Sequence, residues 1–216
     1  MNFQDFIQYI PQLIDAPLPA FASHIKMDPK ERVAALKTFT HKDKNPKKAA
    51  VLMLLYPKLG QTHLVLIERN SYKGVHSAQI AFPGGKFETN DFDYATTALR
   101  ETEEEIGVFR QNIQIIKPFS ALYIPPSNFL VHPFLGIATS ELQFVLEPRE
   151  VSSIIELPLI DFLDDALLCE TKLTTSYATD ITIPAFRIEH HHVWGATAMM
   201  LSELKEVLQS VLNNPR

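Results

Sequence analysis

The sequence predicts a mixed α+β fold in which several short strands surround a central helix. Between residues 49 and 159, short apolar segments alternate with turn signals, as expected for strands. Helical spacing of apolar residues occurs in the middle of the chain, at residues 92–106, and at both ends. The chain has 216 residues, 46% of them hydrophobic, which is enough to form a core that folds alone.

The composition also limits the classes of function. The net charge of -5 gives no reason to expect nucleic acid as a partner, and no apolar run is long enough to span a bilayer. Cys169 is the only cysteine, which excludes an intrachain disulfide and fits a reducing compartment. The first ten residues lack the pattern of a signal peptide. We therefore expect a cytoplasmic enzyme with no membrane partner.

The first 45 residues are predicted to form an N-terminal helical extension, and residues 46–216 the main domain. Phe3, Phe6 and Ile10 recur at helical spacing, and "DAPLPAFAS" then ends this first helix. A second short helix is expected from about residue 28 to 38, with Pro29 in its first turn. The basic segment "HKDKNPKKAA" is interpreted as a solvated linker, with a patch that steers phosphates as the alternative.

The main domain contains a series of predicted strands followed by two helices. "AAVLMLLY" and "THLVLIER" are expected to pair as a hairpin through "PKLGQ". Further strands are predicted at "AQIAF", "IQIIKPF", "LVHPFLGIA" and "VSSIIELPL", and "TDITIPAFRIEH" is expected to pair with "CETKLTTSY". "LIDFLDDALL" and "WGATAMMLSELKEVLQSVL" are predicted helices, the second of them amphipathic.

The central helix carries a cluster of carboxylates. At 100° per residue, one face is predicted to hold Phe92, Ala95, Leu99, Thr102 and Ile106. Three glutamates are predicted to share the opposite face: Glu101, Glu104 and Glu105. Like charges at this spacing repel, but they are favourable around a hard divalent cation, and ligation by oxygen alone indicates Mg²⁺ or Mn²⁺. A solvated acidic face is the alternative interpretation.

The segment before this helix supports the metal interpretation. "FPGGK" ends an apolar strand, and its two glycines permit close approach of the backbone, with carbonyl groups exposed beside the helix. Arg100 directly precedes the glutamates, so we expect it to orient them rather than to contact a substrate. Gly107 suits the C-terminal cap of the helix.

These residues resemble the Nudix hydrolase family. "RETEEEIGV", which begins at Arg100, matches the second half of the family signature. The first half departs from the signature, because Gly85 lies one residue too far upstream and Phe92 stands where a glutamate is expected. Asp91 and Asp93 flank Phe92 and are candidates to substitute for that glutamate.

The longer spacing is similar to that of the coenzyme A diphosphatase branch of the family. "HSAQIAFPGG", which ends at Gly85, is close to a motif of that branch, with Ala78 in place of a glycine. The resemblance implies a mixed sheet sandwiched between helices. It also implies metal-dependent hydrolysis of coenzyme A to adenosine 3′,5′-bisphosphate and 4′-phosphopantetheine.

The resemblance also implies roles for individual residues. Glu101 and Glu105 would be the principal ligands of Mg²⁺ or Mn²⁺, Glu104 would assist or ligate a second ion, and the Gly85 carbonyl would complete the shell. Four further residues are candidates to bind substrate or to act as a late carboxylate: Arg69, His76 and Gln79 for substrate, and Glu150 as base or outer ligand. Their alternatives are a surface salt bridge for Arg69, loop hydrogen bonds for His76 and Gln79, and a solvated strand end for Glu150.

Several hypotheses stay open at this point. The expected partner is a small nucleotide substrate, and a homodimer is the oligomeric state that we consider. A Nudix hydrolase of ADP-ribose, NADH or a dinucleoside polyphosphate is the nearest rival, and a non-catalytic binding domain is a further one. The run His190–His192 is not expected to be the catalytic metal site, because imidazole suits softer metals than Mg²⁺.

Overall fold

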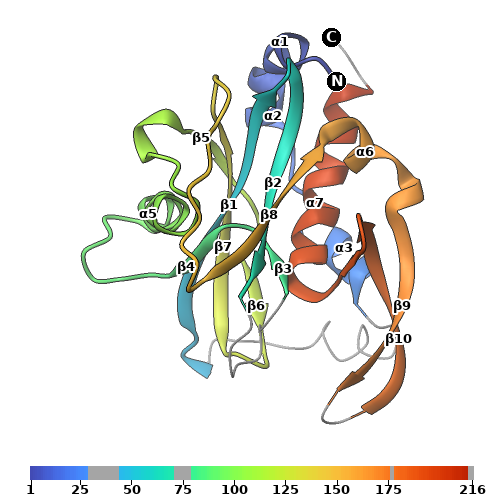
Figure 1. Ribbon diagram of the computed structural model, residues 1–216. Coiled ribbons are helices and arrows are strands. Elements are labelled where there is room, and N and C mark those ends of the chain that lie inside the picture. The colour runs from blue at the N-terminus through green and yellow to red at the C-terminus, as the bar shows by residue number, and fades with distance from the viewer. Residues whose placement is uncertain (29–43, 71–78, 176–177, 214–216) are drawn as a thin grey trace.

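A computed structural model describes residues 1–28, 44–70, 79–175 and 178–213 of the protein (Figure 1). Its centre is a mixed sheet with the strand order β3-β2-β1-β7-β5, to which β4, β6 and β8 are added by pairing with β1, β7 and β2. The pair β1–β7 is parallel and the other pairs are antiparallel. The strands are β1 Lys47–Lys58, β2 Gln61–Arg69, β3 Ile80–Ala81, β4 Gly84–Lys86, β5 Gln114–Pro118, β6 Leu122–Ile124, β7 Phe129–Ile137 and β8 Val151–Pro158.

Helices cover both faces of this sheet, as the resemblance to the Nudix family implies. Figure 1 shows α5 (Tyr94–Ile106) on one side of the sheet and α7 (Gly195–Leu212) on the other. A smaller sheet lies on the side of α7 and contains β9 Leu168–Thr175, β10 Ala178–Ile188 and β11 His191–Val193. The short helical segments are α1 Phe3–Phe6, η1 Ile7–Tyr9, α2 Ile10–Asp15, α3 Phe21–His24, η2 Ile25–Met27, η4 Arg110–Asn112, α6 Leu159–Leu163 and η5 Asp165–Leu167.

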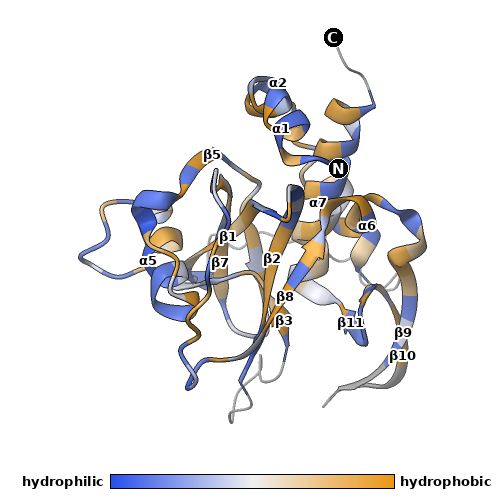
Figure 2. Cartoon of the chain, turned by 45° about the horizontal axis from the view of Figure 1, so that its top comes forward, coloured by the Kyte–Doolittle hydropathy of each residue, from blue (hydrophilic) through white to orange (hydrophobic). Residues whose placement is uncertain are grey.

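Strand β1 explains why the sheet has two apolar faces. Alternate side chains of a strand point to opposite faces, and in β1 both sets are apolar and buried. Met53 and Leu55 contribute to the core beneath α7, whereas Leu52 and Leu54 contribute to the core beneath α5. A strand buried on both faces reads as a continuous apolar run, which is the pattern of "AAVLMLLY". Figure 2 shows the hydrophobic colour along the inner strands and α7.

The predicted central helix is confirmed, but its first residues are not helical. Asp93 is the N-cap and accepts a hydrogen bond from the Thr96 amide at 2.7 Å, so the helix starts at Tyr94. Gly107 ends it at φ 72, in the left-handed conformation predicted for it. Phe92 lies before the cap and is 93% exposed, so its placement on the buried face was wrong.

Other sequence expectations are confirmed in outline. The β1–β2 hairpin and the pairing of β9 with β10 are present, and the closing helix is α7. The N-terminal helix is present but broken into α1, η1 and α2, and "KKAA" belongs to β1 rather than to a linker. The predicted second helix lies almost entirely outside the described residues. Within the described part of the chain, no helix is long and apolar enough to cross a membrane.

Candidate active site

The glycine segment and the start of α5 form one strand–loop–helix unit beside β1. Gly84 has φ 151, and a β-carbon there would lie 2.6 Å from the Val51 Cα, so only glycine allows β4 to approach β1 this closely. The Gly84 amide donates a hydrogen bond to the Glu105 carboxylate at 2.8 Å. The Cα of Gly85 faces the Glu101 carboxylate directly. The two glycines therefore bring the backbone against two of the predicted ligands.

Arg100 organises this unit. Its Nε and one Nη group donate to both carboxylate oxygens of Asp91, at 2.9 and 3.0 Å. The remaining N–H groups reach the Lys86 carbonyl, the Glu101 carboxylate and the Glu104 carboxylate, at 2.9 to 3.0 Å. Because a guanidinium has five N–H donors, these contacts use all of them. The geometry therefore supports Arg100 as a residue that positions the glutamates and leaves no donor for a substrate.

Asp91 is the flanking aspartate that pairs with Arg100. Besides Arg100, it accepts hydrogen bonds from the Glu88 amide and the Thr97 hydroxyl, both at 2.9 Å. The Arg100 guanidinium holds the pKa of this carboxyl well below its usual range. Asp93 instead caps α5. Of the two flanking aspartates considered from the sequence, Asp91 thus takes the place beside the arginine.

Three carboxylates converge at the C-terminal half of α5. Glu101, Glu105 and Glu150 offer oxygen atoms that all lie within 4.8 Å of one another. Glu150 ends a turn just before β8, and its carbonyl accepts a hydrogen bond from the Asn70 amide at 2.7 Å. This contact places the turn at the end of β2, next to the helix. Long-range pairing of β2 with β8 therefore brings a third carboxylate to two that are close in sequence.

The three glutamates of α5 have different environments, contrary to the prediction that they share one outward face. Glu105 is 1% exposed, whereas the side chain of Glu104 is 58% exposed and pairs with Arg100. Glu101 lies between these extremes, with 15% of its side chain exposed. The reason is that β4 and the turn at Glu150 cover one edge of the helix. Glu104 lies outside the group of three converging carboxylates.

Burial raises the pKa of the innermost carboxylate, Glu105. Desolvation raises the pKa of Glu105 to about 7, although Arg69 and the Gly84 amide both act to lower it, and Glu101 and Glu150 add to the rise. Burial raises the pKa of Glu101 in the same direction, against the effect of Arg100. A divalent cation would remove the repulsion between these carboxylates and favour their ionised forms. The donor set, which consists of oxygen atoms alone, fits Mg²⁺ or Mn²⁺.

The raised pKa of Glu105 predicts how the stability of the metal-free protein depends on pH. Because Glu105 holds its proton more tightly in the folded protein than in the unfolded chain, protonation stabilises the folded state. This stabilisation is complete below the pKa that Glu has in the unfolded chain, and it is lost as pH rises through about 7. Between about pH 5.5 and 8, the free energy of unfolding of the natural protein should therefore fall by about 2 kcal/mol relative to that of Glu105→Gln. Urea unfolding in EDTA measures both. Parallel pH profiles of the two proteins would contradict the prediction.

Arg69 connects the carboxylates to a large cavity. One Nη group donates to Glu105 at 3.1 Å, and the Arg69 amide donates to the Gln79 carbonyl at 3.0 Å. Arg69 and Gln79, two of the predicted substrate residues, both line the cavity. His76 lies outside the described residues. In contrast to Arg100, Arg69 has only one of its five donors engaged by the described part of the protein.

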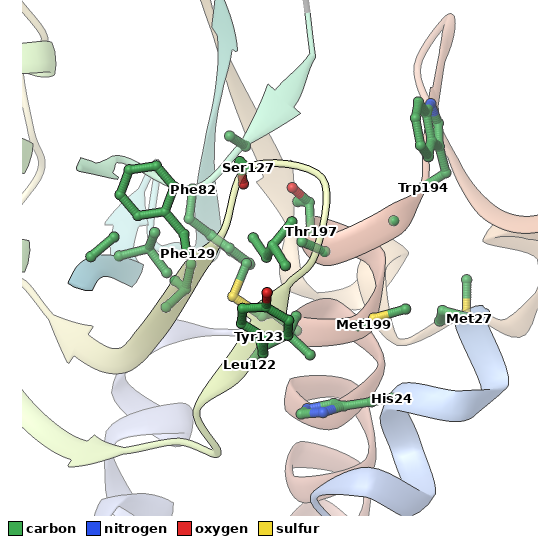
Figure 3. Close-up of a pocket in the computed structure, with 18 of the residues that line it drawn as sticks. His24, Met27, Phe82, Leu122, Tyr123, Ser127, Phe129, Trp194, Thr197 and Met199 are labelled. Atoms are coloured by element: carbon green, nitrogen blue, oxygen red, sulfur yellow. The ribbon is translucent and has the colours of Figure 1, made fainter. Parts of the chain in front are cut away.

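The cavity has a volume of about 790 Å³, within the usual range for small-molecule sites. Arg69, Gly84 and Gly85, which lie next to the carboxylates, line one part of it. From there it extends beneath the sheet between β6, α3 and α7, where Figure 3 shows Tyr123, His24 and Met199. Reasoning from sequence missed most of this lining, because α3 and β6 are too short to leave a clear periodic pattern.

Comparison with known proteins identifies the family of this site. Residues 46–172, more than half of the chain, match the NUDIX domain family. The chain belongs to the Nudix family. It is 30% identical over 172 residues to the Nudix hydrolase NudL of Photorhabdus laumondii, covering 76% of this chain and 87% of that protein. It is 31% identical over 176 residues to NudL of Salmonella dublin, covering 76% and 84%.

A solved structure supports the Nudix fold. RenU, a Nudix hydrolase of M. smegmatis, aligns with a TM-score of 0.54 at 15% identity. The alignment covers 79% of this chain and 91% of RenU. The Nudix assignment makes the protein a hydrolase of diphosphate bonds in nucleoside diphosphate derivatives, in a family that uses divalent metal ions.

The histidine run provides a second group of possible metal ligands, at the turn between β10 and β11. Ligand atoms of Glu189, His190 and His191 lie within 4.8 Å of one another, and these side chains are mostly exposed. Replacing all three histidines, His190–His192, with Asn should leave the Mg²⁺ concentration for half-maximal activity unchanged within about twofold, because imidazole ligands select softer ions. Activity measured against Mg²⁺ concentration tests this. A rise of about tenfold or more in that concentration would show that the turn takes part in metal binding.

Proposed function

We propose that this Nudix hydrolase cleaves the diphosphate of coenzyme A or its derivatives to adenosine 3′,5′-bisphosphate and 4′-phosphopantetheine. The observation that carries the proposal is one cavity that is lined both by Arg69, Gly84 and Gly85, the neighbours of the carboxylates, and by many apolar side chains. Coenzyme A has a matching shape, because its diphosphate joins a polar nucleotide to a long pantetheine arm. The motif "HSAQIAFPGG" before Gly85 supports the same substrate.

Glu101 and Glu105 are the residues proposed to hold Mg²⁺ or Mn²⁺, with the Gly85 carbonyl as a further ligand and Glu150 beside them. The convergence of three carboxylates beside a glycine backbone, one of them buried, fits a hard cation and is costly without one. The metal would supply activation of water and neutralisation of charge on the diphosphate. Glu104, which is more exposed, is proposed to assist or to ligate a second ion.

The protein's own groups would orient the reaction. Arg69 lines the cavity beside Glu105 and is proposed to bind a phosphate oxygen, together with Gln79 and His76. Arg100 holds Glu101 and Glu104 in place. Glu150 is exposed at the edge of the cluster, where it is proposed to accept the proton of the attacking water or to serve as an outer ligand.

The proposed division of the chain follows from the same site. Residues 46–216 are proposed to form the Nudix hydrolase domain, and residues 1–45 an extension that completes the cavity through α3. Another nucleoside diphosphate derivative, such as ADP-ribose, NADH or a dinucleoside polyphosphate, is the alternative substrate. These compounds share the diphosphate but lack the long, weakly polar arm.

A substrate panel tests the proposal. The values of kcat/KM for coenzyme A, ADP-ribose, NADH and diadenosine polyphosphates should be measured under one metal condition, with products identified by mass. We expect coenzyme A to give the highest value and ¹⁸O from water to appear in one of its two products. If another compound exceeds coenzyme A by more than about tenfold, or roughly 1.4 kcal/mol in transition-state binding, the coenzyme A assignment fails.

A further inference from the structure

The far end of the cavity is apolar and is built by segments that are distant in sequence. We call it the apolar arm. Its lining comes from the N-terminal segment, from β10 and from α7: Phe21, Ile25, Met27, Ile183, Met199 and Met200. Figure 3 shows Met27 and Met199 in this part of the molecule. The proposed chemistry takes place at the carboxylates beside Arg69 and Gly84 and uses none of these residues.

A buried carboxylate on α7 holds the N-terminal wall of the apolar arm. Glu203 is 0% exposed, and one of its oxygens accepts hydrogen bonds from the Ala20 amide at 2.9 Å and the Ser120 hydroxyl at 2.5 Å. Its other oxygen accepts from the Ser120 amide at 3.2 Å and lies 3.3 Å from Nε2 of His24. Ala20 and His24 belong to the N-terminal segment, and Ser120 precedes β6. The N-terminal segment, α7 and the residue before β6 thus meet at one side chain.

A buried ion of this kind is weak evidence for a contribution to stability. An ion removed from water costs several kcal/mol, and an apolar residue of the same size is often as good for the fold. Although burial raises the pKa of Glu203, the donors from His24 and Ser120 outweigh this effect and hold the pKa below its ordinary value. The carboxylate is therefore kept ionised in the interior, where it fixes the positions of two main-chain segments.

The N-terminal segment is held in an unfavourable backbone conformation at the same point. Ala20 has φ 50 and ψ -126, a region that residues with a side chain rarely adopt. Such strain persists only where the surroundings determine the conformation strongly. The Ala20 amide donates to Glu203. Relaxation of this residue would change the path by which α3 enters the wall of the apolar arm.

We propose that the apolar arm binds the apolar end of the substrate beyond the diphosphate, and that Glu203 is a positioning residue that holds the N-terminal segment as one wall of this subsite. The inference rests on the proposed function, because the occupant is taken to be the part of a coenzyme A derivative that lies farthest from the nucleotide. Glu203 then governs affinity for the apolar end and leaves the hydrolytic step unchanged.

The composition of the lining specifies the chemistry of the occupant. Three methionines contribute to it, and methionine adapts its flexible thioether to chains of different shape. Burial of each further methylene can raise affinity by up to about fourfold. An unbranched S-acyl chain on coenzyme A is therefore the probe of choice, with free coenzyme A as the ligand that lacks it.

Trp194 allows binding to be measured without turnover. It is the single tryptophan of the chain and lines the cavity, so its fluorescence reports occupancy. In EDTA, octanoyl-coenzyme A should bind at least about tenfold more tightly than coenzyme A to the natural protein. In Glu203→Gln this preference should shrink to about threefold or less, because the carboxylate that aligns the walls is lost.

Kinetics with metal present separate positioning from chemistry. For Glu203→Gln and for the milder Ser120→Ala, KM for octanoyl-coenzyme A should rise by about tenfold and about threefold, with kcat within about twofold of the natural value. Glu206→Gln is the matched control on the same helix, because it removes the ion pair with Lys26, and neither residue lines the cavity. Its KM should stay unchanged.

The outcomes distinguish the two proposals. If coenzyme A compounds are not hydrolysed but Trp194 still reports the acyl preference and its loss in Glu203→Gln, the proposed function fails and the subsite stands. If they are hydrolysed and acyl length affects neither the Trp194 signal nor KM, the subsite is refuted. A folded Glu203→Gln or Ser120→Ala protein with natural KM, or with kcat lowered equally for both substrates, refutes the role of Glu203.

Discussion

Replacing Glu105 with Gln is expected to lower kcat by at least about a thousandfold, because the substitution keeps the shape of a proposed metal ligand but removes its charge. Glu101→Gln should have a similar effect. The thermal stability of the metal-free protein should not decrease, since Glu105 is buried near other carboxylates and its ionised form is disfavoured in the absence of metal. Steady-state kinetics over a range of Mg²⁺ concentrations, with thermal unfolding in EDTA, measure both effects.

Glu103→Gln is the control for this prediction. Glu103 lies on the same helix, but its carboxylate pairs with Arg110 at 2.7 Å, away from the converging group. Its removal should change kcat by less than about threefold. If Glu101→Gln and Glu105→Gln both turn over at near-natural rates in saturating Mg²⁺, the assignment of these two residues to the metal site is wrong.

Gly85→Ala is expected to reduce kcat/KM by about a hundredfold or more, although it adds only one methyl group. A β-carbon at Gly85 would lie 2.5 Å from Cδ and 2.7 Å from Oε1 of Glu101, closer than such atoms approach one another. The carboxylate must therefore rotate out of the site. Because it is the end of a flexible side chain, the fold should tolerate this movement, and the melting temperature should change little.

Gly84→Ala provides the contrast. A β-carbon there would meet the backbone of Ala50 and Val51, which cannot rotate away, and φ 151 is unfavourable for any side chain. This variant should lose stability by several kcal/mol, as seen in urea unfolding. Gly85→Ala with kcat/KM within about threefold of the natural value would show that Glu101 does not need its observed position.

Local patterns predicted the fold well where the structure depends on neighbours in the chain. The hairpin β1–β2 follows from two apolar runs and a short turn, and α5 follows from its caps and its helical spacing. The error at Phe92 has a local cause as well. Periodicity alone extended the helix past Asp93, whose side chain ends the helical hydrogen bonding at that residue.

The sequence by itself was enough to predict a carboxylate cluster on α5 with two glycines before it, because these residues all lie in one short segment. Only the tertiary structure decided that Glu105 is buried, that Glu104 is not, and that Glu150 joins them from a turn 45 residues beyond Glu105. The contact of Ala20 with Glu203 spans 183 residues. Such contacts depend on how strands and helices pack, and a periodic pattern shows which face is buried but not against which partner.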